Sequence, residues 1–186
     1  MNALTKMIAS FGLALGLMPA ASAIAGTPRV GQVPTDFTLQ TPAGESVQLS
    51  QLTDQGPVVL VVLRGWPGYQ CPICTKQVAE LVGKSKELTA AKARVVLVYP
   101  GPSASLKEHA EDFARGKSLP DNFHFVIDPD YTFTNSYGLR WEAPGETAYP
   151  STFVIDSKGK VAFAKTSRSH GDRARVTDVI KTLGVR

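Results

Sequence analysis

Six consecutive aliphatic residues, Val58 to Leu63, constrain the fold of this chain more than any other feature. A valine-dominated run of this kind is typical of a strand that is buried on both faces of a sheet. A loop containing glycine and proline follows, and Cys71-Pro72-Ile73-Cys74 then opens a segment with helical spacing, whose first turn accommodates a proline. The sequence therefore predicts a central strand whose carboxyl end delivers two cysteines to a helix N-terminus, the edge at which such sheets carry their chemistry.

Strands and helices alternate along the rest of the chain, and a capping-box pattern at 105–108 opens one of the helices. The hairpin signals at both ends of the domain predict antiparallel pairs, whereas the first crossover predicts parallel neighbours. We therefore expect an α/β fold with a mixed central sheet, helices on both faces and an N-terminal β-hairpin. The expected elements are hairpins at 36–49 and 152–164, strands at 58–63, 95–99 and 123–127, and helices at 72–92, from 105, and at 176–183.

Length and charge limit the function classes open to this chain. Its 186 residues suit a single domain. The net charge of +4, from 20 basic and 16 acidic residues, is small and scattered, so nucleic-acid binding is not expected. Two cysteines exclude a multi-disulfide framework and a four-cysteine zinc site. Any cysteine chemistry must therefore be carried by one pair.

Residues 1–23 have the layout of a secretory signal peptide: a basic start, the apolar stretch Met7 to Met18, and a small-residue cleavage pattern that ends at Ala23. A second such pattern ends at Ala25. The apolar stretch is too short to span a membrane as a helix. We expect cleavage to leave one domain at 24–186 that is exported, secreted or periplasmic, and not held at a membrane. Disulfides persist in such compartments.

The pair Cys71 and Cys74 is the chemical feature of the sequence. A helix N-terminus favours an anion, and this placement lowers the pKa of a thiol. The two-residue spacing also lets the sulfurs close a small, readily exchanged disulfide. Such a dithiol is a two-electron redox centre that needs no metal and no other cofactor.

Three other interpretations of the cysteine pair remain open. A structural disulfide over so short a loop stabilises a protein only weakly. Half of a zinc site is a second possibility, but there is no second CxxC, and the three histidines lack the spacing of a zinc finger. Two buried thiols without a role are the third. The context of strand, CxxC and helix favours redox chemistry.

Three segments resemble the thioredoxin superfamily and, within it, the redoxin branch of alkyl hydroperoxide reductases and thiol-specific antioxidants. They are Val33–Leu39 before the first hairpin, Leu63–Cys74 around the dithiol, and Pro150–Asp156 in the strand expected to face it. The similarity extends over residues 30–184. The resemblance implies a thioredoxin-like fold and an antioxidant enzyme that reduces hydroperoxides, with an external thiol as electron donor; the signal peptide makes it an exported one.

The resemblance leaves the roles of the two cysteines open. Peroxiredoxins carry Pro-x-x-x-Thr-x-x-Cys, and Pro67 through Cys74 fits this pattern except that Cys71 replaces the threonine. By that match Cys74 attacks the peroxide and Cys71 resolves the product, which is the assignment we expect. By the thioredoxin match, Cys71 attacks instead. Helix geometry favours Cys71 as the accessible sulfur.

A second departure concerns the positive charge near the sulfurs. Peroxiredoxins usually place an arginine just before the strand expected at 152–155, where this chain has Tyr149-Pro150, and thioredoxins place a cis-proline there. Pro150 is thus a candidate cis-proline. Arg64 and Arg140 are candidates for the missing charge, although a salt bridge at a strand end and a solvated loop position are the simpler interpretations.

These departures keep a second function in view. It is a periplasmic thiol–disulfide oxidoreductase that acts on protein disulfides, which the cysteine at position 71 and Pro150 favour. A third, non-catalytic class is a redoxin scaffold that binds a partner or a metal through the dithiol.

Overall fold

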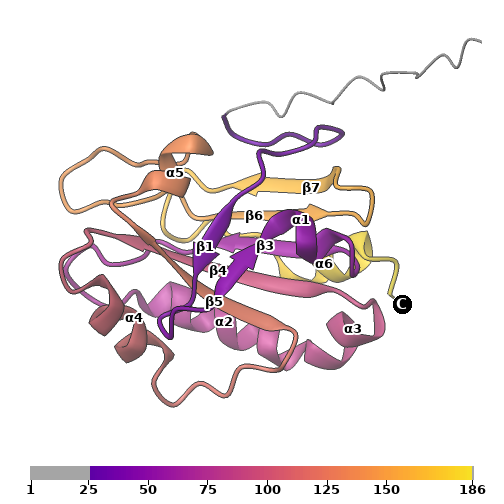
Figure 1. Ribbon diagram of the computed structural model, residues 1–186, viewed down its shortest axis with the longest axis horizontal. Coiled ribbons are helices and arrows are strands. Elements are labelled where there is room, and N and C mark those ends of the chain that lie inside the picture. Colours follow the sequence, from indigo (N-terminus) through magenta and orange to yellow (C-terminus); the bar gives the residue numbers. More distant parts are fainter. Residues whose placement is uncertain (1–25, 186) are drawn as a thin grey trace, which may run out of the picture.

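The computed structural model describes residues 26–185 as one seven-stranded sheet with helices on both faces (Figure 1). The expected signal peptide, residues 1–23, lies outside the described residues. The strand order is β2-β1-β5-β4-β3-β6-β7. The strands are β1 (Thr38–Gln40), β2 (Ser46–Gln48), β3 (Val58–Val62), β4 (Arg94–Gly101), β5 (Phe123–Pro129), β6 (Ser151–Ile155) and β7 (Val161–Thr166).

Two parallel pairings lie at the centre of the sheet, and two antiparallel pairings lie on each side of them. The pairs β3·β4 and β4·β5 are parallel, and the pairs β1·β2, β1·β5, β3·β6 and β6·β7 are antiparallel. The expected mixed sheet and the hairpins at both ends are confirmed. All five residues of β3 are buried, and its two neighbours, β4 and β6, carry their own neighbours on the far side.

The helices divide into two groups, one for each face of the sheet. Helices α2, α3, α4 and α6 contribute to the core that contains Val59 and Val61, whereas α1 and α5 contribute to the core that contains Val58, Leu60 and Val62. In Figure 1, α2, α3 and α4 lie together along one side. The helices are α1 (Leu49–Thr53), α2 (Pro72–Gly83), α3 (Ser85–Ala90), α4 (Leu106–Ala114), α5 (Thr132–Ser136) and α6 (Val176–Thr182).

Two local expectations were wrong. The single helix expected at 72–92 is interrupted at Lys84, which ends α2 and precedes α3; Gly83, a poor helix former, stands directly before the break. The capping box at 105–108 does not form, because Ser105 has a left-handed backbone with φ of 59° and its side chain makes no capping hydrogen bond.

Within residues 26–185, none of the helices has the length and apolar character needed to cross a membrane.

Candidate active site

The loop between β3 and α2 sets the position of both cysteines. Its first glycine, Gly65, has φ of +74°, and a Cβ there would lie 1.8 Å from the carbonyl oxygen of Pro100 at the end of β4. The next residue, Trp66, donates its main-chain N–H to that same carbonyl, at 3.0 Å. Because only glycine fits so close an approach, the loop is fastened to the neighbouring strand, and α2 begins beside the end of the sheet.

Cys71 is the N-cap residue of α2. Its Sγ accepts a hydrogen bond from the main-chain N–H of Cys74, at 3.4 Å. The pKa of Cys71 is lowered from 9.0 to about 5, first by the hydrogen bond from the Cys74 thiol, and further by main-chain N–H groups at the helix start and by the charge of Arg173, all against the opposing effect of burial. A thiol with this pKa is a thiolate at neutral pH.

Cys74 lies one turn further into α2 and is more deeply buried, with 1% of its surface exposed against 4% for Cys71. Its pKa is raised, because its thiol proton is shared with Cys71 and because burial disfavours the charged form. Both cysteines are free thiols. The pair therefore holds one negative charge centred on Cys71, with the remaining proton on Cys74.

Two donors from distant parts of the chain contact the Cys74 sulfur. The main-chain N–H of Arg64, just after β3, lies 3.4 Å from Sγ, and Nη2 of Arg173, in the segment before α6, lies 3.6 Å from it. The guanidinium of Arg173 also donates to Oε1 of Gln77, at 3.0 Å, and to the carbonyl oxygen of His170, at 2.8 Å. Arg173 is thus the cation at the dithiol.

Sequence reasoning did not find Arg173. It lies 99 residues after Cys74, in a segment without apolar periodicity, and no motif marks it. Only the packing of α6 beside α2 brings the two together. The only sequence signal is that Arg173 is one of several arginines just before the last helix, and nothing distinguishes it from Arg168 or Arg175.

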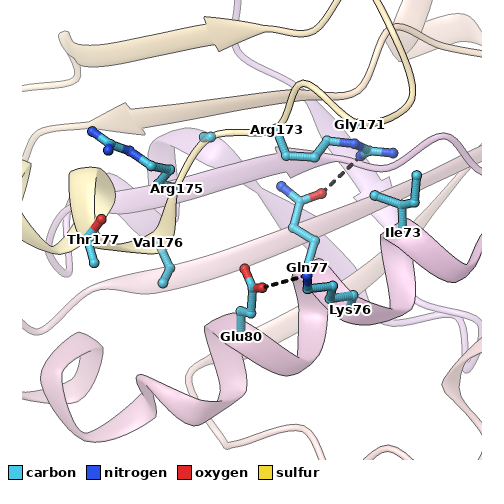
Figure 2. Close-up of a pocket in the computed structure, with 10 residues that line it drawn as sticks. Ile73, Lys76, Gln77, Glu80, Gly171, Arg173, Arg175, Val176 and Thr177 are labelled. Atoms are coloured by element: carbon cyan, nitrogen blue, oxygen red, sulfur yellow. Dashed lines mark hydrogen bonds and ion pairs between the residues drawn. The ribbon is translucent and has the colours of Figure 1, made fainter.

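A groove with a volume of about 440 Å³ runs beside this contact, between α2 and the segment that leads into α6 (Figure 2). Arg173 and Gln77 line the groove, and the hydrogen bond between them is visible in Figure 2. Since Arg173 also contacts the Cys74 sulfur, this side chain connects the groove with the dithiol. Ile73 and Lys76 from α2 and Arg175 and Val176 from the opposite wall complete most of the lining.

The side chain of Arg64 forms a buried ion pair. Its Nε lies 2.8 Å from Oε2 of Glu146, and its other nitrogens donate to the carbonyl oxygen of Gly145 and to the hydroxyl of Tyr69. The expectation that its charge could serve the dithiol is therefore corrected: Arg64 supplies its main-chain N–H to Cys74 and its charge to Glu146.

Arg140 does not supply the missing charge either. Its guanidinium donates to the carbonyl oxygens of Trp141, Glu146 and Thr147 and lies 4.0 Å from the ring centroid of Tyr131. These contacts hold the loop between α5 and β6 together. Arg140 is thus a structural residue of that loop.

Two prolines that the resemblance marks as supporting residues, Pro67 and Pro150, lie in the loop before α2 and directly before β6. Pro67 is half-buried in the loop between β3 and α2. Pro150 is buried directly before β6, and its carbonyl oxygen accepts a hydrogen bond from the N–H of Ser167, at 2.8 Å. Residues 26–185 contain no cis peptide bond, so the expectation of a cis-proline at position 150 was wrong. The same residues contain no cluster of three or more His, Cys, Asp or Glu side chains that could hold a metal ion.

Fold and site together define a thioredoxin-like α/β protein of the peroxiredoxin type. The model of the AhpC/TSA family matches residues 30–164, and the chain belongs to that family. It is 29% identical over 140 residues to a chloroplastic peroxiredoxin Q of Triticum aestivum, which covers 75% of this chain and 60% of the wheat protein. It is 28% identical over 153 residues to a chloroplastic peroxiredoxin Q of Populus jackii, which covers 82% of this chain and 67% of that protein.

Solved structures show the same architecture. The crystal structure of peroxidoxin BcpB from Mycobacterium tuberculosis superposes with a TM-score of 0.66 at 26% identity, over 84% of this chain and 97% of the other. A yeast mitochondrial 1-Cys peroxiredoxin superposes with a TM-score of 0.65 at 17% identity, over 84% of this chain and 75% of the other. The second likeness concerns the fold alone.

Proposed function

We propose that this protein is a thiol peroxidase that reduces hydroperoxides through the dithiol of Cys71 and Cys74. The observation that carries the proposal is the place of the Cys71 sulfur at the N-terminus of α2, where it accepts the main-chain N–H of Cys74. The neighbouring Cys74 thiol and this environment lower the pKa of Cys71 to about 5. Membership of the AhpC/TSA family supports it. The proposed reaction needs no metal and no organic cofactor.

The reaction proceeds in three balanced steps. The Cys71 thiolate attacks one oxygen of the O–O bond, which gives a sulfenic acid on Cys71 and releases an alcohol, or water from hydrogen peroxide, once the leaving oxygen has taken up a proton. The Cys74 sulfur then attacks the sulfenic sulfur; its proton and the hydroxyl leave as water, and the Cys71–Cys74 disulfide forms. An external thiol donor returns two electrons and two protons to the pair.

This assignment reverses the roles expected from the peroxiredoxin pattern, in which Cys74 attacks and Cys71 resolves. Electrostatics favour the reversal, because the pKa of Cys71 is lowered and that of Cys74 is raised. Cys71 is also the more exposed of the two sulfurs. Arg173 contacts Cys74 but stabilises negative charge on both sulfurs, since its charge lowers both pKa values.

The runner-up is a thiol–disulfide oxidoreductase, for which an acidic Cys71 would also attack first. Its second support in the sequence is Pro150, which lies buried directly before β6. One experiment separates the two functions: turnover of hydrogen peroxide and of a scrambled protein disulfide, measured with one preparation and one thiol donor. Rapid peroxide turnover with slow disulfide turnover supports the peroxidase. The opposite ratio would establish the oxidoreductase.

We also propose that the protein is exported and that it works in the periplasm or outside the cell. The support is the signal-peptide layout of residues 1–23. N-terminal analysis of the protein recovered from the exported fraction should find a chain that begins at Ile24 or Gly26. A full-length chain retained in the membrane fraction would contradict the proposal.

A further inference from the structure

The two donors on the Cys74 sulfur come from segments that are far apart in the sequence. Arg64 follows β3, whereas Arg173 lies in the segment 167–175 between β7 and α6. That segment has no regular secondary structure along most of its length. The position of the Arg173 guanidinium therefore depends on the side chains that fasten the segment to the rest of the domain.

Glu146 joins the two donors through its two carboxylate oxygens. Oε2 accepts from Nε of Arg64, at 2.8 Å, and Oε1 lies 2.8 Å from Nε2 of His170. The carbonyl oxygen of His170 in turn accepts from Nε of Arg173, at 2.8 Å. A continuous path thus runs from Arg64 through Glu146 and His170 to Arg173, and both ends of the path contact the Cys74 sulfur.

We propose that Glu146 is a positioning residue that ties segment 167–175 to the end of β3 and so holds Arg173 against the dithiol. The inference rests on the proposed function only in that it concerns the same pair of sulfurs. Glu146 suits the role because its side chain is only 12% exposed and meets a guanidinium that is 4% exposed. Charge-assisted hydrogen bonds in such a partly dry site are stronger than those at an open surface.

The start of the segment is held by two other contacts: the main-chain N–H of Ser167 donates to the carbonyl oxygen of Pro150, at 2.8 Å, and the Arg168 guanidinium lies 5.4 Å from the ring centroid of Tyr149. Arg173 lies towards the other end of the segment, where the remaining contacts are weaker or do not reach β3. The Lys165–Asp172 ion pair is exposed, and pairs of that kind contribute little. The hydrogen bond between Arg173 and Gln77 orients the guanidinium but does not reach the end of β3. The ring of His170 also packs against Trp141, with ring centroids 5.4 Å apart, which fixes the imidazole in front of the Glu146 carboxylate.

Glu146 remains an anion at neutral pH and can therefore hold both partners. Its pKa is lowered because the hydrogen bonds and charges of Arg64 and His170 outweigh its burial. Loss of this carboxylate leaves the Arg64 guanidinium without its ion-pair partner and frees His170. Segment 167–175 would then move, and the field of Arg173 at the dithiol would weaken.

A set of variants tests whether Glu146 and His170 act on the dithiol through Arg173. The measured quantity must respond to the charge at the sulfurs and not merely to the stability of the fold. The readout is the pH dependence of thiol alkylation in the reduced protein, which reports the pKa of the reactive thiol without any peroxide. Glu146→Gln and His170→Ala are each made alone and together with Arg173→Ala. Glu142→Gln is the matched control, an exposed carboxylate in the same loop.

Each single variant should raise the reactive thiol pKa and lower the alkylation rate near its midpoint by about three- to tenfold. In the Arg173→Ala background neither change should shift the thiol pKa further, because the guanidinium that Glu146 and His170 position is then absent. Glu142→Gln should behave as wild type. Should Glu146→Gln fail to fold, His170→Ala decides, since that side chain is 39% exposed.

Two results would overturn the inference. One is an unchanged thiol pKa in both single variants, and the other is an equal shift with and without Arg173. Alkylation needs no peroxide, so the two proposals can fail separately. If the single variants shift the thiol pKa only when Arg173 is present, but the protein does not consume peroxide, the proposed function is rejected and this inference stands. If the protein consumes peroxide but the variants leave the thiol pKa unchanged, the inference is rejected and the proposed function stands.

Discussion

Cys71 and Cys74 stand one helical turn apart, yet their sulfurs have different surroundings. Cys71 sits at the N-cap of α2, where main-chain N–H groups stabilise a thiolate, whereas Cys74 lies deeper and keeps the shared proton. At the scale of single residues, the proposed chemistry follows from this asymmetry. In the proposed reaction the Cys71 thiolate attacks at neutral pH, and the Cys74 thiol closes the disulfide.

The lowered pKa of Cys71 predicts an early onset of reactivity with pH. An ordinary thiol is protonated below a pKa of 9.0, but Cys71 loses its proton near a pH of about 5. The alkylation rate of the reduced protein should therefore rise through this midpoint and reach a plateau by neutral pH, and it should fall as the pH drops below the midpoint. Cys71→Ser is the control and should lose this phase. A midpoint near the ordinary thiol value would contradict the site described here.

Single residues were predictable where a local pattern marks them. The CxxC spacing after a buried strand identified Cys71 and Cys74 and their place at a helix start. Arg173 and Glu146 reach the site through long-range packing, and no spacing within either segment refers to the other. Arg64 and Arg140 were candidates for the positive charge near the sulfurs because they lie close to the motifs in the sequence, but their guanidinium groups bind other partners.

At the scale of elements, the junction of β3 and α2 depends on one glycine. Gly65→Ala should lower the free energy of unfolding by about 2–4 kcal/mol, because the new Cβ meets the Pro100 carbonyl and the backbone has a positive φ. Gly68→Ala is the matched control: its φ is +107°, but nothing lies within 4 Å of the added Cβ. Urea unfolding of both variants measures the difference. Equal losses would show that backbone strain alone, and not the contact with β4, is responsible.

Elements with strong hydrophobic patterns were predictable, and their ends were less so. The buried strand at 58–62 and both hairpins follow from runs of β-branched residues and from turn signals. The break at Lys84 was missed because apolar residues continue at helical spacing on both sides of it. Ser105 was misjudged because a capping box requires an extended backbone, and the turn before α4 gives this residue a left-handed one.

At the scale of the whole molecule, the thiolate links the redox state to stability. The unfolded chain binds the Cys71 proton up to its ordinary pKa of 9.0, whereas the folded protein releases it near a pH of about 5. Between these values the reduced fold gains stability as the pH rises, and it loses this gain as the pH falls through the lower value. The disulfide form has no such proton to release.

The stability of the reduced protein, relative to the oxidised protein, should therefore increase with pH between these two values. Urea unfolding of both forms at several pH values measures the difference. Cys71→Ser, which has neither the acidic thiol nor the disulfide, should show the pH dependence of the oxidised protein between these values. A difference between reduced and oxidised protein that does not change with pH would contradict the lowered pKa.

The fold class was predictable, but the order of the strands was not. The crossover from β3 to β4 fixes a parallel pair, and the final hairpin fixes β6 beside β7. The pairing of β1 with β5 depends on a single register contact, Gln40 with Ile127, between distant segments. No sequence pattern predicts that β1 pairs with β5. The order also brings the loop before β6 and the segment before α6 to one end of the sheet, and so assembles the site.

Sulfenic acid trapping in the two single-cysteine variants tests the central claim most directly. Reduced Cys74→Ser and Cys71→Ser protein each receive one equivalent of hydrogen peroxide with a sulfenic-acid reagent, and mass spectrometry locates the label. The account predicts a label on Cys71 in Cys74→Ser protein and slow or absent labelling of Cys71→Ser protein. A label on Cys74 alone would reverse the roles of the two sulfurs, and no label in either variant would contradict peroxide reduction by this dithiol.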